Sequence, residues 1–134
     1  MNRLAVTMGA LLLLAAAAAG CALTRSAASE RMDVAGVVAA LAREGVTLQR
    51  QGSVAEPDLT TSGEEFLTTG GTVRIFEYGS EASAALDAAR LNADAADLFE
   101  PPHIYHQGNI IAVYYGDNSG VDAALSRVLG SKIG

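Results

Sequence analysis

The sequence predicts an α+β fold, an antiparallel sheet of about five strands with helices packed on one face. Three observations predict it. Apolar residues recur at helical spacing in three segments, they alternate with polar residues in others, and glycine-centred turns join neighbouring strands. Hairpins separated by helices are typical of a sheet that carries its helices on one side and leaves the other side open.

The first predicted helix begins after Asp33, a residue type that caps helices, and ends near Gly45. Its apolar side chains recur at i, i+3, i+4 and i+7: Val34, Val37, Val38 and Leu41. The following residues 46–54 alternate in polarity, which predicts a half-buried strand with Thr47 and Gln49 on its outer side.

A predicted hairpin turns at the Gly70-Gly71 pair and leads into a strand over residues 72–78. Alternation points Val73 and Ile75 to the core and sends three side chains outward: Arg74, Phe76 and Tyr78. Glu77 falls on the buried side, where a carboxylate needs a partner, and Arg50 of the preceding strand is the expected one.

Two further helices are predicted. The first begins at Ser80 and is expected to lie on the sheet through its small residues, Ala82, Ala85, Leu86 and Ala89. We expect its charged residues to face water: Asp87, Arg90 and Asp94. The last helix begins near Ser119, ends at Gly130 and buries Val121, Ala124, Leu125 and Val128.

Between these helices, residues 101–118 read PPHIYHQGNIIAVYYGDN and combine two histidines, three tyrosines and a tight-turn signal. The Gly108-Asn109 pair suits a two-residue hairpin turn in which the glycine takes a positive φ. Pairing outward from this turn separates the side chains into two sets. One set, expected in the core, includes Ile104, Ile111 and Val113, and the other includes His103, Tyr105 and Tyr114.

The outward side chains of all these strands predict a binding surface on the open sheet face. The candidate residues are Thr47, Gln49, Arg74, Phe76, Tyr78, His103, Tyr105 and Tyr114. Tyrosine and arginine are enriched where interfaces bind tightly, and exposed apolar area of this kind marks contact surfaces. Two alternatives stay open: residues 57–67 could cover this face, or the chain could associate with itself through it.

No catalytic residue, metal ligand or cofactor is predicted. His103 and His106 are three positions apart, which on a strand sends them to opposite sides, so the pair cannot chelate one ion. The segment GDNSGVD, residues 116–122, offers oxygen ligands but lacks the spacing of a calcium loop, and a turn with a helix cap explains it. The alternative function is an envelope hydrolase or metal-dependent enzyme centred on His103.

The first residues predict export, since Arg3 precedes an apolar run over residues 4–19. The Ala18-Ala19-Gly20 segment before Cys21, the only cysteine, resembles the lipobox of bacterial lipoproteins, although leucine is usual where Ala18 stands. The resemblance implies a signal peptide over residues 1–20, a lipidated Cys21 opening a flexible tether over 21–31, and one domain over 32–134. The alternatives are an ordinary cleaved signal and an uncleaved span over residues 4–23.

An anchor with more than one acyl chain would hold the protein on an extracytoplasmic membrane surface. Because Ala22 and not aspartate follows Cys21, the lipoprotein resemblance implies the outer membrane in a Gram-negative host. Loss of residues 1–20 removes only Arg3 among nine basic residues, which leaves 15 acidic and eight basic residues, a formal net charge of −7. This charge excludes nucleic acid and leaves an envelope protein or a small molecule as the expected ligand.

The segments TVRIFEYGSEASAALDAA, PPHIYHQGNIIAVYYGDN and VLGSKIG resemble a family of small bacterial lipoproteins and secreted proteins. That family carries V-x-V-F-E-Y, an alanine-rich helix and P-P-H-x-Y-x-x-G followed by Y-x-G-D. The likeness covers about residues 73–134, and its most specific matches are Pro102, His103, Tyr105 and Gly108. The tryptophan expected shortly before Pro101 is absent. The resemblance implies location and fold and offers no activity.

Overall fold

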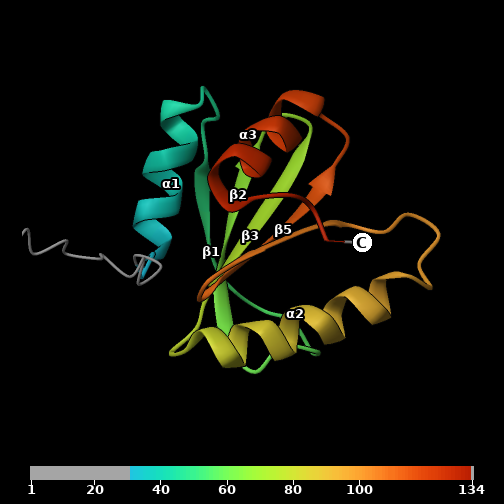
Figure 1. Ribbon diagram of the computed structural model, residues 1–134. Helices are drawn as coiled ribbons and strands as arrows, with labels where there is room; N and C mark the ends of the chain where they lie inside the picture. The colour runs from blue at the N-terminus through green and yellow to red at the C-terminus, as the bar shows by residue number, and fades with distance from the viewer. Residues whose placement is uncertain (1–30, 134) are drawn as a thin grey trace, which may run out of the picture.

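The computed structural model describes residues 31–133, so the predicted signal peptide, Cys21 and residues 22–30 of the tether lie outside the described part. The described chain forms one antiparallel sheet and three helices (Figure 1). The elements are α1 (Val34–Arg43), β1 (Gln49–Ala55), β2 (Ser62–Thr68), β3 (Gly71–Glu77), α2 (Glu81–Ala95), β4 (His103–Gln107), β5 (Ile110–Gly116) and α3 (Ser119–Leu129). The predicted α+β class and the five antiparallel strands are confirmed, in the order β1-β2-β3-β5-β4.

Each helix begins at a polar side chain that accepts a backbone N–H of its first turn. Asp33 accepts from the Gly36 amide at 2.7 Å, and Ser80 accepts from the Ser83 amide at 3.1 Å. The amide oxygen of Asn118 accepts from two backbone amides at the start of α3. The helix cap predicted within residues 116–122 is therefore confirmed.

Both predicted hairpins form, and glycine occupies the turn position with positive φ in each. Gly70 (φ 75°) turns β2 into β3, and Gly108 (φ 55°) turns β4 into β5. The β4–β5 register is the predicted one, with His103 opposite Tyr114 and Tyr105 opposite Ala112.

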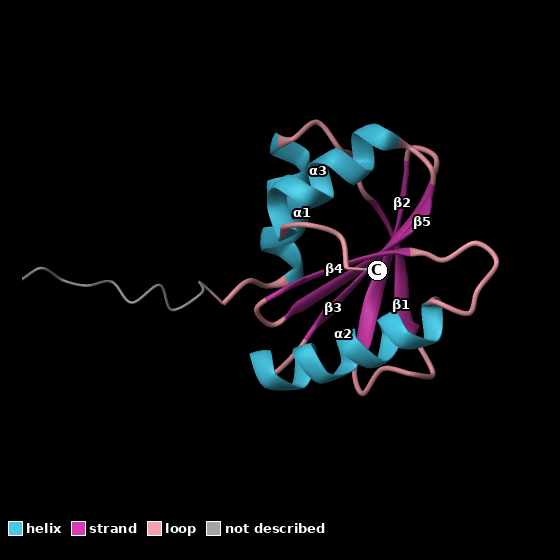
Figure 2. Ribbon diagram, turned by 45° about the vertical axis from the view of Figure 1, so that its right-hand side comes forward, coloured by secondary structure: helices cyan, strands magenta, loops and turns pink. Residues whose placement is uncertain are grey.

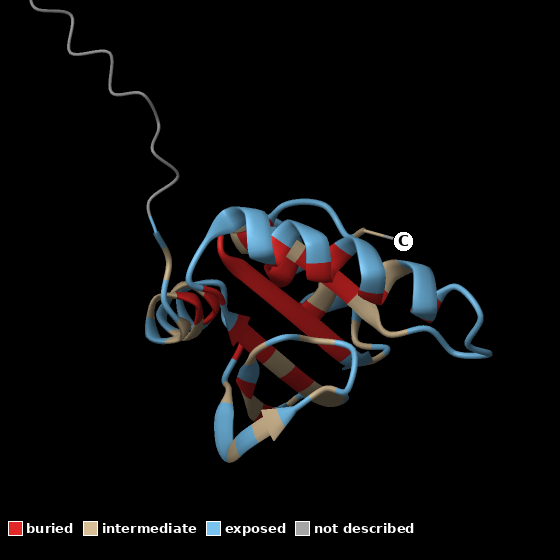
Figure 3. Ribbon diagram, turned by 90° about the horizontal axis from the view of Figure 1, so that it is seen from below, coloured by how far each residue is buried: buried red, intermediate tan, exposed pale blue. Residues whose placement is uncertain are grey.

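Helices cover both faces of the sheet, which corrects the prediction that all lie on one face (Figure 2). α1 and α3 cover one face, burying Val37, Leu41, Val121, Ala124, Leu125 and Leu129 against side chains of β2 to β5. α2 covers the other face through Ala84, Ala88, Leu91 and Ala95, over Phe76, Ile104, Ile111 and Val113. Buried residues therefore fill the central strands between two helical layers (Figure 3).

The predicted open sheet face does not exist as one surface. Val73, predicted to face the core, pairs with Tyr114, predicted to face outward, and paired residues lie on the same side of a sheet. The outward side chains predicted for β3 and those predicted for β4 and β5 therefore lie on opposite sides. Arg74, Phe76 and Tyr78 lie on the α2 side, whereas His103, Tyr105 and Tyr114 lie on the side of α1 and α3. Four of these six side chains are buried: Phe76, Tyr78, Tyr105 and Tyr114. The alternative cover is confirmed in part, since Leu59 packs against the α2-side core.

The predicted inner and outer sides of α2 are also wrong. Leu86, expected against the sheet, is exposed, and Asp87, expected in water, is buried. The Asp87 carboxylate accepts hydrogen bonds from the Thr60 amide and hydroxyl, both at 2.7 Å, and from the Tyr78 hydroxyl at 3.0 Å. Burial alone would raise the pKa of Asp87, but these bonds and the nearby Arg90 charge outweigh it and lower the pKa.

Two smaller corrections concern charged residues of the strands. Glu77 is exposed, and its carboxylate accepts a hydrogen bond from the Val34 amide at 3.4 Å. Arg50 pairs instead with Glu64 of β2 at 3.2 Å.

The chain enters the domain beside the β4–β5 turn. The buried side-chain amide of Asn109 accepts from the Met32 N–H at 3.3 Å and donates to the Met32 carbonyl at 2.9 Å. The Asn109 amide also donates to the Tyr78 carbonyl, which fixes the entering chain to the end of β3. None of the helices within residues 31–133 is long and apolar enough to cross a bilayer.

Candidate functional site

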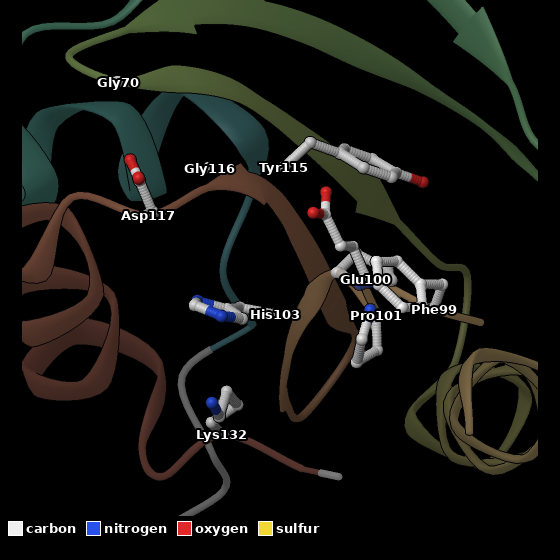
Figure 4. Close-up of a pocket in the computed structure, with 10 residues that line it drawn as sticks. Gly70, Phe99, Glu100, Pro101, His103, Tyr115, Gly116, Asp117 and Lys132 are labelled. Carbon is white, nitrogen blue, oxygen red and sulfur yellow. The ribbon is translucent and has the colours of Figure 1, made fainter. Parts of the chain in front are cut away.

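A groove of about 710 Å³ lies at the end of the sheet where β4 begins and β5 ends (Figure 4). Its walls come from the loop after α2, the first residue of β4, the end of β5 and the C-terminal segment. The side chains that give it chemical character are Phe99, Glu100, His103, Tyr115, Asp117 and Lys132. Its volume falls in the range typical of small-molecule sites.

The proline pair before β4 explains why the groove forms here. Pairing of β4 with β5 stops at His103 and Tyr114, so the last residues of β5 have no partner on this side. Pro101 and Pro102 have no N–H to donate and cannot continue the ladder. The loop therefore separates from β5, and the end of β5 borders the groove.

His103 is held by a carboxylate of α3. Its Nδ1 lies 2.5 Å from Oδ1 of Asp122, and the Tyr105 hydroxyl donates to the same oxygen at 2.7 Å. A carboxylate accepts and does not donate, so Nδ1 of His103 carries the proton. Burial and the Asp122 carboxylate raise the pKa of the Tyr105 hydroxyl, which stays a donor.

Tyr114 fixes the other side of the imidazole. Its ring meets the His103 ring edge to face, with centroids 5.9 Å apart. The Tyr114 hydroxyl donates to the Thr69 carbonyl at 3.1 Å and accepts from the Asn118 amide at 3.1 Å, so the ring cannot swing away. Within residues 31–133 no hydrogen-bond partner engages Nε2 of His103, which is therefore the nitrogen available to a ligand.

Tyr115 forms a wall of the groove on the α2 side of the sheet. The Arg74 guanidinium lies 4.9 Å from the centre of the Tyr115 ring, and the Tyr115 hydroxyl donates to Glu56 at 3.1 Å. Arg74 is itself paired with Glu56 and Glu65. Burial and then the Glu56 carboxylate raise the pKa of Tyr115. The ring is thus held in place although it is 38% exposed.

Three charged side chains and one apolar ring of the groove are free for a ligand. The side chains of Glu100, Asp117 and Lys132 have no hydrogen bond or ion pair within the described residues. Lys132 is also the only lysine of the sequence. Phe99 is 99% exposed, an unusual state for a phenylalanine.

Of the eight side chains predicted to bind, only His103 lines the groove. Arg74 does not line the groove but contacts the ring of Tyr115, which does. Tyr105 and Tyr114 support His103 from the core. Sequence reasoning missed five lining side chains: Phe99, Glu100, Tyr115, Asp117 and Lys132. No local pattern in the sequence joins Lys132 to Pro101, Pro102 and His103, which precede it by about thirty residues and meet it only in the folded chain.

The two histidines lie on opposite sides of β4, as predicted. His103 lies opposite Tyr114 of the α3-side core, while His106 lies opposite Ile111 of the α2-side core and contacts the Gly108 carbonyl at 3.0 Å. Among residues 31–133, no three His, Cys, Asp or Glu side chains come close enough to hold a metal ion.

Comparisons of this chain with protein families, with curated proteins and with solved structures find no match.

Proposed function

We propose that this protein is a lipid-anchored cell-envelope lipoprotein whose single domain is a non-catalytic binding module. The anchor is the acylated Cys21, and the tether over residues 21–31 joins it to the domain. The binding site is the groove at the ends of β4 and β5, in place of the sheet face predicted from the sequence.

The observation that carries the binding site is a set of unsatisfied side chains in one concave place. Glu100, Asp117 and Lys132 keep their hydrogen-bonding groups free, and Phe99 exposes its whole ring. His103 and Tyr115, by contrast, are fixed by partners behind the groove wall. A rigid wall that faces free polar groups is the arrangement expected of a ligand site.

Anchoring would raise the effective concentration of this domain towards ligands at the same envelope surface. Changing Cys21→Ser tests the anchor, because the variant cannot be acylated at sulfur. We expect the variant to leave the membrane fraction and to take up no labelled fatty acid. Firm membrane retention of Cys21→Ser would contradict the lipoprotein proposal.

The single lysine allows a test of the binding site in native membranes. We compare the rate at which an amine-reactive ester acylates Lys132 in intact envelope membranes and in the purified chain in detergent. As a reference, Leu86→Lys places a second lysine on the exposed outer side of α2. In membranes, but not in detergent, we expect Lys132 to be acylated more slowly than the reference lysine. The same ratio of the two rates in membranes and in detergent would contradict occupancy of the groove.

A second candidate function is a hydrolase centred on His103, and the Asp122 contact is the observation that favours it. A carboxylate that fixes the Nδ1 proton leaves Nε2 as a general base for a water molecule. In such a step, water would lose a proton to Nε2 and attack a carbonyl carbon, and the leaving oxygen would take that proton. Turnover of p-nitrophenyl acetate by the native chain, abolished in His103→Gln, would favour this candidate over the binding module.

A further inference from the structure

The charges that face the groove are of both signs. Glu100 and Asp117 would repel an anion, and Lys132 would repel a cation. No side chain in the described residues neutralises these three groups. A ligand of a single charge is therefore attracted by one part of the groove and repelled by another, whereas an uncharged polar ligand meets no repulsion.

The hydrogen-bonding roles of these groups define the ligand more closely. The Glu100 and Asp117 carboxylates are acceptors, and Nε2 of a neutral His103 is an acceptor because Nδ1 holds the proton against Asp122. The Lys132 ammonium is a donor only. The ligand must thus donate at several points and accept at another. Hydroxyl groups do both with one atom, so a ligand rich in hydroxyls can satisfy every wall.

Two aromatic rings add an apolar surface. Tyr115 and Phe99 line the groove on the side away from Lys132 (Figure 4). The Arg74 guanidinium over the Tyr115 ring and the hydrogen bond from the Tyr115 hydroxyl to Glu56 restrict this ring before any ligand arrives. The C–H face of a sugar ring packs on such rings while its hydroxyl edge stays free for polar side chains.

The position of the groove indicates where such a ligand comes from. The entering chain is fixed at the turn before β5, through Asn109, whereas the groove lies where β5 ends. Seven residues of β5 separate these places by about 20 Å. The groove is therefore on the end of the domain away from its tether, as Figure 1 shows for the two ends of the β4–β5 hairpin.

We infer that the groove binds an uncharged saccharide of the aqueous envelope, in contact with Tyr115, Phe99, His103 and Lys132. This inference rests on the proposed function and names its ligand class. A lipid headgroup of the anchoring membrane is disfavoured, because the groove and the tether lie at opposite ends of the sheet.

The single lysine again provides the measurement. Reductive methylation of the full-length chain in detergent micelles with ¹³C-formaldehyde gives one side-chain NMR signal, from Lys132. We titrate maltotriose, fully N-acetylated chitotriose and mannotriose, with trialanine as a zwitterionic peptide and inorganic phosphate as an anion. We expect at least one trisaccharide to shift the Lys132 signal with a Kd below about 10 mM, and trialanine and phosphate to leave it in place.

Matched variants show whether a shift arises in the groove. Phe99→Ala removes a fully exposed ring and should weaken trisaccharide binding at least fivefold without unfolding the chain. Leu86→Ala removes an exposed side chain of α2 and should leave the Kd unchanged. Equal effects of the two variants would overturn the proposal.

The remaining outcomes separate the two proposals. A shift with trialanine or phosphate and none with the trisaccharides overturns the saccharide class while the binding groove stands. Silence from all five compounds also overturns the saccharide inference, and the Lys132 acylation ratio in native membranes then decides whether the groove is a binding site at all.

Discussion

One oxygen of Asp122 joins two side chains of β4 to α3: Nδ1 of His103 lies 2.5 Å from it and the Tyr105 hydroxyl 2.7 Å. The first contact faces the groove and the second lies in the core, since Tyr105 is 1% exposed. The packing of α3 on the sheet and the orientation of the groove imidazole therefore depend on the same carboxylate. A change in one should be measurable in the other.

The Tyr105 hydroxyl tests the structural half of this relationship. Tyr105→Phe keeps the ring but removes the donor to Asp122, so we expect the free energy of unfolding to fall by about 1 to 2 kcal/mol. Urea denaturation followed by circular dichroism measures it. Tyr115→Phe is the matched control, because its hydroxyl bonds to Glu56 at the surface, and should change stability by less than about 0.5 kcal/mol. Equal losses in both variants would contradict the role of Asp122.

Asp87 predicts a dependence of stability on acid pH. Its pKa is lowered in the folded chain, so its contribution is present above the unfolded value of about 3.9 and is lost as pH falls below it. Asp87→Asn should lower the free energy of unfolding at pH 7 by about 1 to 3 kcal/mol. Between pH 5 and pH 3, the variant should lose less stability than the native chain does. Asp94→Asn, exposed on the same helix, should keep the native profile. Parallel profiles for all three chains would show that Asp87 is not the acid-sensitive group.

Gly71 predicts that β3 and β5 approach too closely for a side chain beside the groove. A Cβ there would stand 1.9 Å from the Tyr115 carbonyl oxygen, so Gly71→Ala must push the strands apart. We expect the free energy of unfolding to fall by about 2 kcal/mol or more. We also expect weaker binding of a ligand in the groove, because the Tyr115 side chain moves with its carbonyl. Gly79→Ala meets nothing within 4 Å and should change stability by less than about 0.5 kcal/mol. Thermal denaturation of both variants measures these changes. A Gly71→Ala protein as stable as the native chain would contradict the close approach of β3 and β5.

Local sequence signals predicted the elements well, and the relations between them poorly. The caps Asp33 and Ser80 and the turns at Gly70 and Gly108 follow from backbone chemistry within a few residues, and all are where the sequence placed them. The error arose where two hairpins meet. Each hairpin alternates correctly, but only the pairing of Val73 with Tyr114 shows which sides coincide, and that register is not written in either hairpin.

The site was predicted less completely for a related reason. Alternation along a strand identifies the buried side only if the other side faces water. Here α2 covers the side of β3 that was expected to be open, and α1 and α3 cover the side of β4 and β5 that was expected to be open. Leu86 and Asp87 were also assigned to the wrong sides of α2. Alanine occurs on every side of this helix, so the sequence does not indicate which side is buried. The groove unites the loop after α2 with the C-terminal segment, and long-range contacts of loops have no periodic signal in a sequence.

The most direct measurement of the central claim, that this groove is where the anchored protein binds, is photo-crosslinking in native membranes. A photoreactive residue replaces Phe99 at the groove, and the same residue replaces Leu86 on the outer side of α2; both positions are exposed, so the fold tolerates them. We predict a discrete adduct from position 99 that position 86 does not give. Identical adduct patterns from both positions, or none from position 99, would contradict the claim.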